Sequence, residues 1–68
     1  MLGLEAKLMK EYEGKSAQEI AAAPVTAIAG VSDGDAELLL KAFNIKTVRD
    51  LGTNKYFRWA QSITHLAD

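Results

Sequence analysis

Three helix-start signals divide this 68-residue chain into short segments. Each consists of a serine or threonine followed three residues later by an acid. At this spacing the hydroxyl oxygen can accept the backbone N–H of the acid, and the carboxylate can accept the backbone N–H of the serine or threonine. They are Ser16 with Glu19, Ser32 with Asp35, and Thr47 with Asp50. Pro24 and several glycines and asparagines separate the segments that these signals open. The sequence therefore predicts a series of short helices joined by tight turns.

The apolar residues repeat at helical spacing, and no segment alternates in the manner of a strand. We therefore predict the all-α class, as a compact bundle of four or five short helices in one domain, 1–68. Asn44 is expected to take the left-handed conformation after the central helix. The predicted parts are an N-terminal amphipathic helix in 1–14, a core over 16–52 and a C-terminal helix in 54–67. Within the core we expect helices at 17–23 and 33–43. Short turns of helix are expected at 25–29 and from Thr47 to a stop at Gly52.

Composition excludes several classes of protein. Without cysteine the chain has no disulfide framework and no thiolate metal site, which fits a reducing compartment. Its apolar runs are too short to span a bilayer, and charges directly follow the first four residues, so no signal-peptide core is present. We expect a cytoplasmic protein with no cofactor, no metal, no membrane association and no evident small-molecule substrate.

The residues that catalysis uses have simpler explanations in this sequence. His65 is the only histidine, and its nearest acid in sequence is Asp68 at the end of the last predicted helix. The hydroxyl groups of Ser16, Ser32 and Thr47 are explained by helix capping. We therefore expect no enzyme activity and name no catalytic or metal-binding residue.

Charge is distributed unevenly along the chain, although the net charge is only −1. Residues 1–40 carry three lysines against seven acids, whereas residues 41–58 carry five cations against one acid. Four of these cations flank two predicted helix starts, whose unpaired N–H groups attract anions. Tyr56 and Trp59 would add aromatic rings on which bases stack. The candidate nucleic-acid contact is Lys46, Arg49, Lys55 and Arg58, which we expect to lie well away from Asp33, at the far end of a helix about 16 Å long.

Two apolar stripes are candidates for protein contact. The N-terminal stripe comprises Leu2, Leu4, Leu8, Met9 and Tyr12. It either closes the core of the domain or packs against another chain, since a domain this small often gains stability by association. The stripe of the last helix, Tyr56, Trp59, Ile63 and Leu66, presents the same two alternatives.

Three stretches within residues 20–52 follow the motifs of one known pattern. The phrase Ala27-Ile28-Ala29-Gly30-Val31 is similar to an L-x-G-I-G hairpin, and residues 36–39 are similar to the A-x-x-L that follows such a hairpin. Residues 43–51, FNIKTVRDL, are similar to a G-I-x-T-V-x-D-L segment. On these motifs, residues 20–52 resemble the helix-hairpin-helix superfamily, in particular the type found in the C-terminal domain of the RNA polymerase α-subunit. The resemblance implies a helix-hairpin-helix-like element within the bundle, and DNA binding through backbone N–H groups at the hairpin.

The hairpin departs from the pattern of DNA-binding members. Ser32 stands where the second glycine is found, and Asp33 and Asp35 occupy the first turn of the next helix. A phosphate there would meet two like charges, at a cost of about 1 kcal/mol each. The leading hypothesis is therefore a small non-enzymatic helical module for protein–protein interaction or self-association. The alternative is a nucleic-acid-binding module that contacts phosphates through the four cations at 46, 49, 55 and 58.

Overall fold

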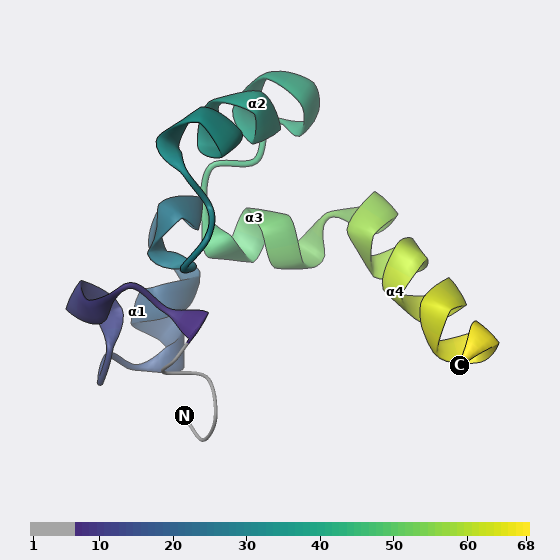
Figure 1. Ribbon diagram of the computed structural model, residues 1–68, viewed down its shortest axis with the longest axis horizontal. Helices are drawn as coiled ribbons and strands as arrows, with labels where there is room; N and C mark the ends of the chain where they lie inside the picture. Colours follow the sequence, from purple (N-terminus) through teal and green to yellow (C-terminus); the bar gives the residue numbers. More distant parts are fainter. Residues whose placement is uncertain (1–6) are drawn as a thin grey trace.

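The computed structural model describes residues 7–68, and its regular structure is helical throughout that range, without a β-strand (Figure 1). The predicted all-α class is confirmed. In chain order the elements are the 3₁₀ helix η2 (Lys10–Tyr12), α1 (Ala17–Ala21), the 3₁₀ helix η3 (Val25–Ala27), α2 (Asp33–Phe43), α3 (Val48–Thr53) and α4 (Lys55–Ala67).

The three predicted helix starts are all present as reciprocal capping boxes. At each, the hydroxyl oxygen accepts the acid's backbone N–H, and the carboxylate accepts the backbone N–H of the serine or threonine. The bonds measure 3.1–3.2 Å. Because these bonds join residues only three apart, α1, α2 and α3 begin where the local sequence places them.

The ends of the helices follow the prediction less closely. Asn44 takes the left-handed conformation after α2, with φ 58° and ψ 34°, as predicted. Helix α1 ends at Ala21, two residues earlier than expected, because Ala22 and Ala23 already bend toward Pro24. Gly52 does not end α3, which continues to Thr53 before Asn54 becomes extended.

The core lies around the short segment after α1. Five side chains are buried among the described residues, namely Ile20, Ala23, Val25, Ala27 and Ile45. The backbone of this segment bonds to the chain on both sides. Val25 N donates to Lys46 O at 3.1 Å and Val48 N donates to Ala23 O at 2.9 Å, while Met9 N donates to Ala27 O at 2.8 Å. Residues 23–27 therefore connect the N-terminal segment to the start of α3.

The predicted N-terminal amphipathic helix is wrong over the described residues 7–14. Leu8 forms an isolated antiparallel bridge with Ile28, Met9 is extended, and η2 is a single 3₁₀ turn. The physical reason is that Met9 N bonds to Ala27 O, across the fold, instead of closing a local helical turn. Residues 1–6 lie outside the described part of the chain.

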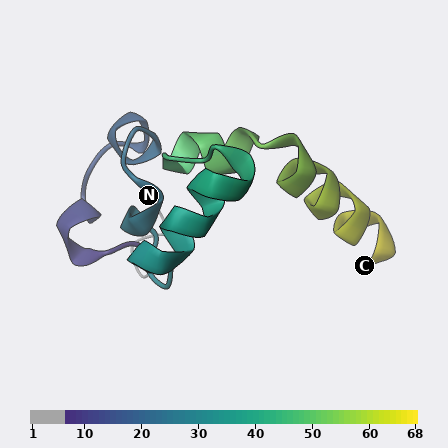
Figure 2. The same cartoon turned by 90° about the horizontal axis from the view of Figure 1, so that it is seen from above.

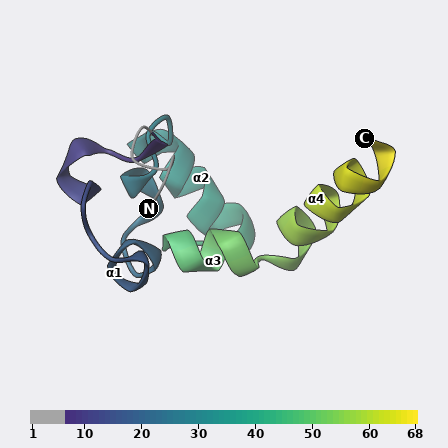
Figure 3. The same ribbon diagram turned by 90° about the horizontal axis from the view of Figure 1, so that it is seen from below.

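The predicted compact bundle is also wrong, because α4 extends away from the other helices (Figures 1 and 2). The radius of gyration is 12.7 Å, compared with about 11 Å for a compact domain of this length. Only Phe57 in α4 is half-buried, and residues 58–68 are all exposed. The view from below shows the same projection, with the C-terminus at its far end (Figure 3).

The left-handed turn at Asn44 yields a stability prediction. An L-residue with a β-carbon and no hydrogen-bonding side chain is strained in this conformation, so Asn44→Ala should lower the free energy of unfolding by about 1 kcal/mol. Asn44→Gly should not lower it, because glycine enters this region without steric cost. Urea unfolding followed by far-UV circular dichroism measures both. Equal stability of the alanine and glycine variants would contradict the prediction.

Candidate functional site

The last helix is held to the rest of the molecule only at its first turns. Asn54 caps α4, its side-chain oxygen accepting the N–H groups of Tyr56 at 3.0 Å and Phe57 at 3.3 Å. The ring of Phe57 lies edge-on to Phe43, at the end of α2, with a centroid distance of 5.5 Å. Tyr56 lies 6.1 Å from the same ring. These aromatic contacts and the cap orient α4, and the remaining turns extend into solvent.

Four of the eight large apolar side chains that are exposed among the described residues lie along α4. Tyr56, Trp59, Ile63 and Leu66 are exposed by 52%, 58%, 66% and 88% respectively, so exposure rises with distance from the core. We call these four residues the apolar face of α4. Their spacing of three, four and three residues is that of the a and d positions of a coiled-coil seam.

Lys55 orders the aromatic end of this face. Its ammonium nitrogen lies 5.2 Å from the centroid of Tyr56 and 5.9 Å from that of Trp59. The two rings meet edge to face, 5.8 Å apart and at 88°. Cation–π contacts of this kind contribute about 0.5–1 kcal/mol at exposed sites. These contacts therefore restrict the two aromatic side chains.

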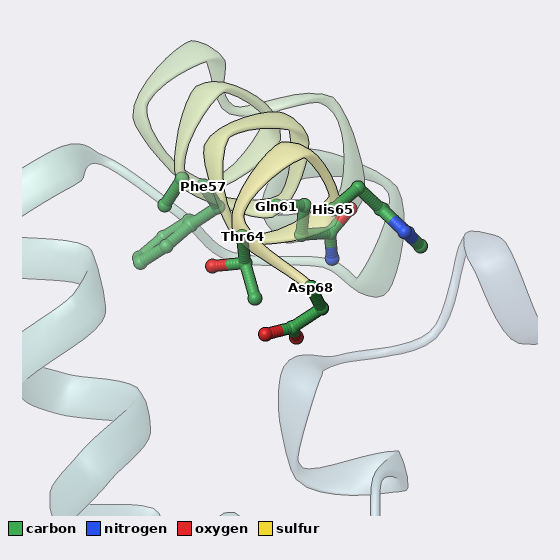
Figure 4. A pocket seen from close by; sticks show the side chains of 6 residues that line it. Phe57, Gln61, Thr64, His65 and Asp68 are labelled. Carbon is green, nitrogen blue, oxygen red and sulfur yellow. The ribbon is translucent and has the colours of Figure 1, made fainter.

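The opposite flank of α4 carries both polar and apolar side chains and has no catalytic geometry. A hollow of about 590 Å³ is lined by Phe57, Ala60, Gln61, Thr64, His65 and Asp68, all from α4 and its end (Figure 4). The side chains of His65 and Asp68 point in different directions there and form no acid–base pair (Figure 4). Residues 7–68 contain no cluster of three or more histidines and acids placed to hold a metal ion.

The four cations predicted to bind an anion are not gathered at one site. Lys46 lines a hollow of about 390 Å³ together with Asp33 and Glu37, whereas Arg58 lines another of about 350 Å³ beside Leu51. Lys55 lies over the aromatic rings, and Arg49 is exposed on α3. The four therefore offer an anion no common pocket.

For Lys46 the expected separation from Asp33 is wrong, since the two residues line the same hollow. The chain reverses at Asn44, and Val25 N then bonds to Lys46 O. This return places Lys46 beside η3 and the start of α2 rather than beyond the far end of that helix.

The helix start at Thr47, expected to be open to an anion, is already filled by a carboxylate. Asp50 Oδ2 accepts the backbone N–H groups of Lys46 and Thr47, each at 3.1 Å. These bonds hold the pKa of the Asp50 carboxyl below its ordinary value, chiefly through the Lys46 N–H and then the Thr47 N–H. At the start of α4, Asn54 similarly occupies two N–H groups. A phosphate would have to displace these bonds.

The predicted N-terminal interface is only partly described. Leu2 and Leu4 lie outside the described residues. Leu8 and Tyr12 are half-buried, and Leu8 lines an apolar hollow of about 340 Å³ with Ile20 and Val48, while Met9 is exposed. The described residues of this stripe therefore do not form one continuous helical face.

The spacing of the stripe on the last helix predicts either a protein contact or a helix that faces the core, and its four side chains are exposed in the structure. No protein-family model, curated protein or solved structure matches this chain.

No helix within residues 7–68 combines the length and apolar character needed to cross a membrane.

The bonds to Asp50 predict a pH dependence. Since the folded state lowers the pKa of this carboxyl, its stabilising effect is complete above the ordinary carboxyl pKa and is lost as the pH falls through the lowered value. Asp50→Asn should therefore be less stable than the wild type at pH 7, and the difference should shrink below about pH 4. Urea midpoints between pH 7 and pH 2 measure this. A difference that stayed constant over that range would contradict the assignment.

Proposed function

We propose that this chain is a small non-enzymatic helical module that binds another protein or a second copy of itself. The observation that carries the proposal is the exposed apolar face of α4, held away from the core by contacts at its first turns alone. A contiguous apolar surface of this kind is typical of a site of association, whereas single exposed apolar residues are ordinary.

The composition of the face supports this function. Tyrosine and tryptophan are enriched among the residues that dominate binding energy at interfaces. Trp59 is the single tryptophan of the chain and lies within the face, beside Tyr56. Because Lys55 and the edge-to-face contact already restrict both rings, less side-chain entropy is lost when a partner covers them.

In this proposal, residues 20–52 are a helix-hairpin-helix-like platform that carries α4. Gly30 has φ +99° at the position of the hairpin glycine, and reciprocal caps follow at Ser32 and Thr47. Asp35 and Asp50 occupy the backbone N–H groups of these caps. Such a platform serves to position the last helix, since its helix starts are closed to phosphate.

Nucleic-acid binding is the second candidate, and one arrangement favours it. A cation, Lys55, lies over two exposed aromatic rings on which bases can stack. Against it, the other predicted cations are dispersed, and Lys46 shares its hollow with two acids. We therefore rank this function below protein binding.

Site-specific photo-cross-linking in cells tests the proposed function. A photoreactive amino acid at Ile63, within the apolar face, should yield discrete cross-linked species containing the chain and a second polypeptide. The matched control is the same substitution at Thr64, on the opposite flank of α4. If a variant that remains helical gives no cross-linked product specific to position 63, the proposal is contradicted.

A fluorescence polarisation titration with labelled duplex and single-stranded DNA tests the alternative. We expect no binding at micromolar protein in about 50 mM salt, conditions under which even non-specific phosphate contacts are strong. Binding that is lost on raising the salt, and lost in a Lys55→Glu/Arg58→Glu variant, would establish the alternative instead.

A further inference from the structure

We infer that the partner of the apolar face of α4 is the same face of a second copy, with the two helices antiparallel about a two-fold axis. This inference rests on the proposed function and narrows its partner. The sequence order of the face, the surface of the chain and the charges of α4 each support it.

The apolar face is symmetric along the helix about Gln61. Tyr56 and Leu66 lie five residues on either side of this centre, and Trp59 and Ile63 lie two residues on either side. In an antiparallel pair centred here, Tyr56 faces Leu66 of the second copy and Trp59 faces Ile63 of the second copy. Every apolar residue thus meets an apolar residue, which is the self-complementarity that a two-fold interface requires.

The chain exposes more surface than a compact monomer of its mass. Its accessible area is 5235 Å² for a mass of 7.4 kDa, which is about 1,000 Å² more than a compact monomer of this mass exposes. A stable protein–protein interface removes about 800 Å² from each partner. The projecting helix is open to a second copy along its length (Figures 2 and 3).

The charges of α4 oppose its own helix dipole and suit an antiparallel neighbour. Helices α1, α2 and α3 each carry an acid in the first turn, whereas α4 carries none and begins with Lys55. A cation at a helix N-terminus is unfavourable, and one beside a C-terminus is favourable. In the antiparallel pair, Lys55 lies beside the C-terminal end of the second copy's α4, where the last carbonyl groups carry negative partial charge.

The association itself is measured by sedimentation of the full chain and by the fluorescence of Trp59. We expect a monomer–dimer equilibrium, with an emission maximum that moves to shorter wavelength as the concentration rises. Ile63→Asp should weaken association roughly 100-fold or more, because each copy would bury an unpaired carboxylate. Thr64→Asp, on the opposite flank, should leave it unchanged. A wild type that stays monomeric at millimolar concentration overturns this inference.

The antiparallel register is measured by distances between spin labels, since the chain has no native cysteine to interfere. At a helix spacing of 8–10 Å, labels on Ser62→Cys, one residue from the centre, should lie close together. Labels on Ala67→Cys should lie about 18 Å apart along the axis, and hence roughly 10 Å farther apart than the Ser62 pair. Equal distances at the two positions would show a parallel pair and overturn the register.

Reversal of charge provides a second check on the register. Lys55→Glu should strengthen α4 itself, by placing an acid in its first turn, yet weaken association three- to tenfold. Association that is unchanged by Lys55→Glu contradicts the antiparallel register.

These results also separate the inference from the proposed function. A monomeric chain that still forms heterologous cross-links from position 63 would retain the proposed function and refute the second copy as partner. A monomer with no such cross-links would refute both.

Discussion

Two backbone hydrogen bonds join the segment around Pro24 to the segment after Asn44, and the rest of the structure depends on them. Val25 N donates to Lys46 O, and Val48 N donates to Ala23 O. They connect parts of the chain more than twenty residues apart and enclose Ile45 and Val25, the largest fully buried side chains. Because of these bonds, the chain turns back along the core after Asn44 instead of continuing away from it.

A core of this size covers few helices. The buried residues of the described chain are aliphatic ones from α1, η3, the turn between them and the turn after α2, and neither α2 nor α4 contributes a buried side chain. Helix α4 reaches the molecule through Phe57 and the exposed ring of Phe43. Small domains bury a smaller fraction of their surface than large ones, and here the apolar face of α4 remains exposed, as do side chains of α2 such as Leu38. That surplus is the physical basis of the proposed association.

The candidate sites show where sequence reasoning succeeded and failed. The caps were predicted correctly because each joins residues three apart, but the same caps close the helix starts that the cations were expected to serve. Asp50 marks a helix start in the sequence, but only the folded geometry shows that its carboxylate accepts both the Lys46 and the Thr47 N–H groups. Lys46 and Asp33, expected at opposite ends of a helix, share a hollow because the chain turns back.

The sequence by itself determined the helical class, the starts of α1 to α4, the left-handed Asn44 and the apolar stripe of the last helix. These features depend on bonds and side-chain spacings within a few residues, which the local sequence specifies. Only the tertiary structure decided that the segment after Lys7 is not an α-helix, that the four cations are dispersed and that the stripe of α4 faces solvent. Each of these depends on a partner distant in sequence: Met9 on Ala27, Lys46 on Val25, and Phe57 on Phe43. The spacing of residues along the sequence does not specify which distant group a residue will contact.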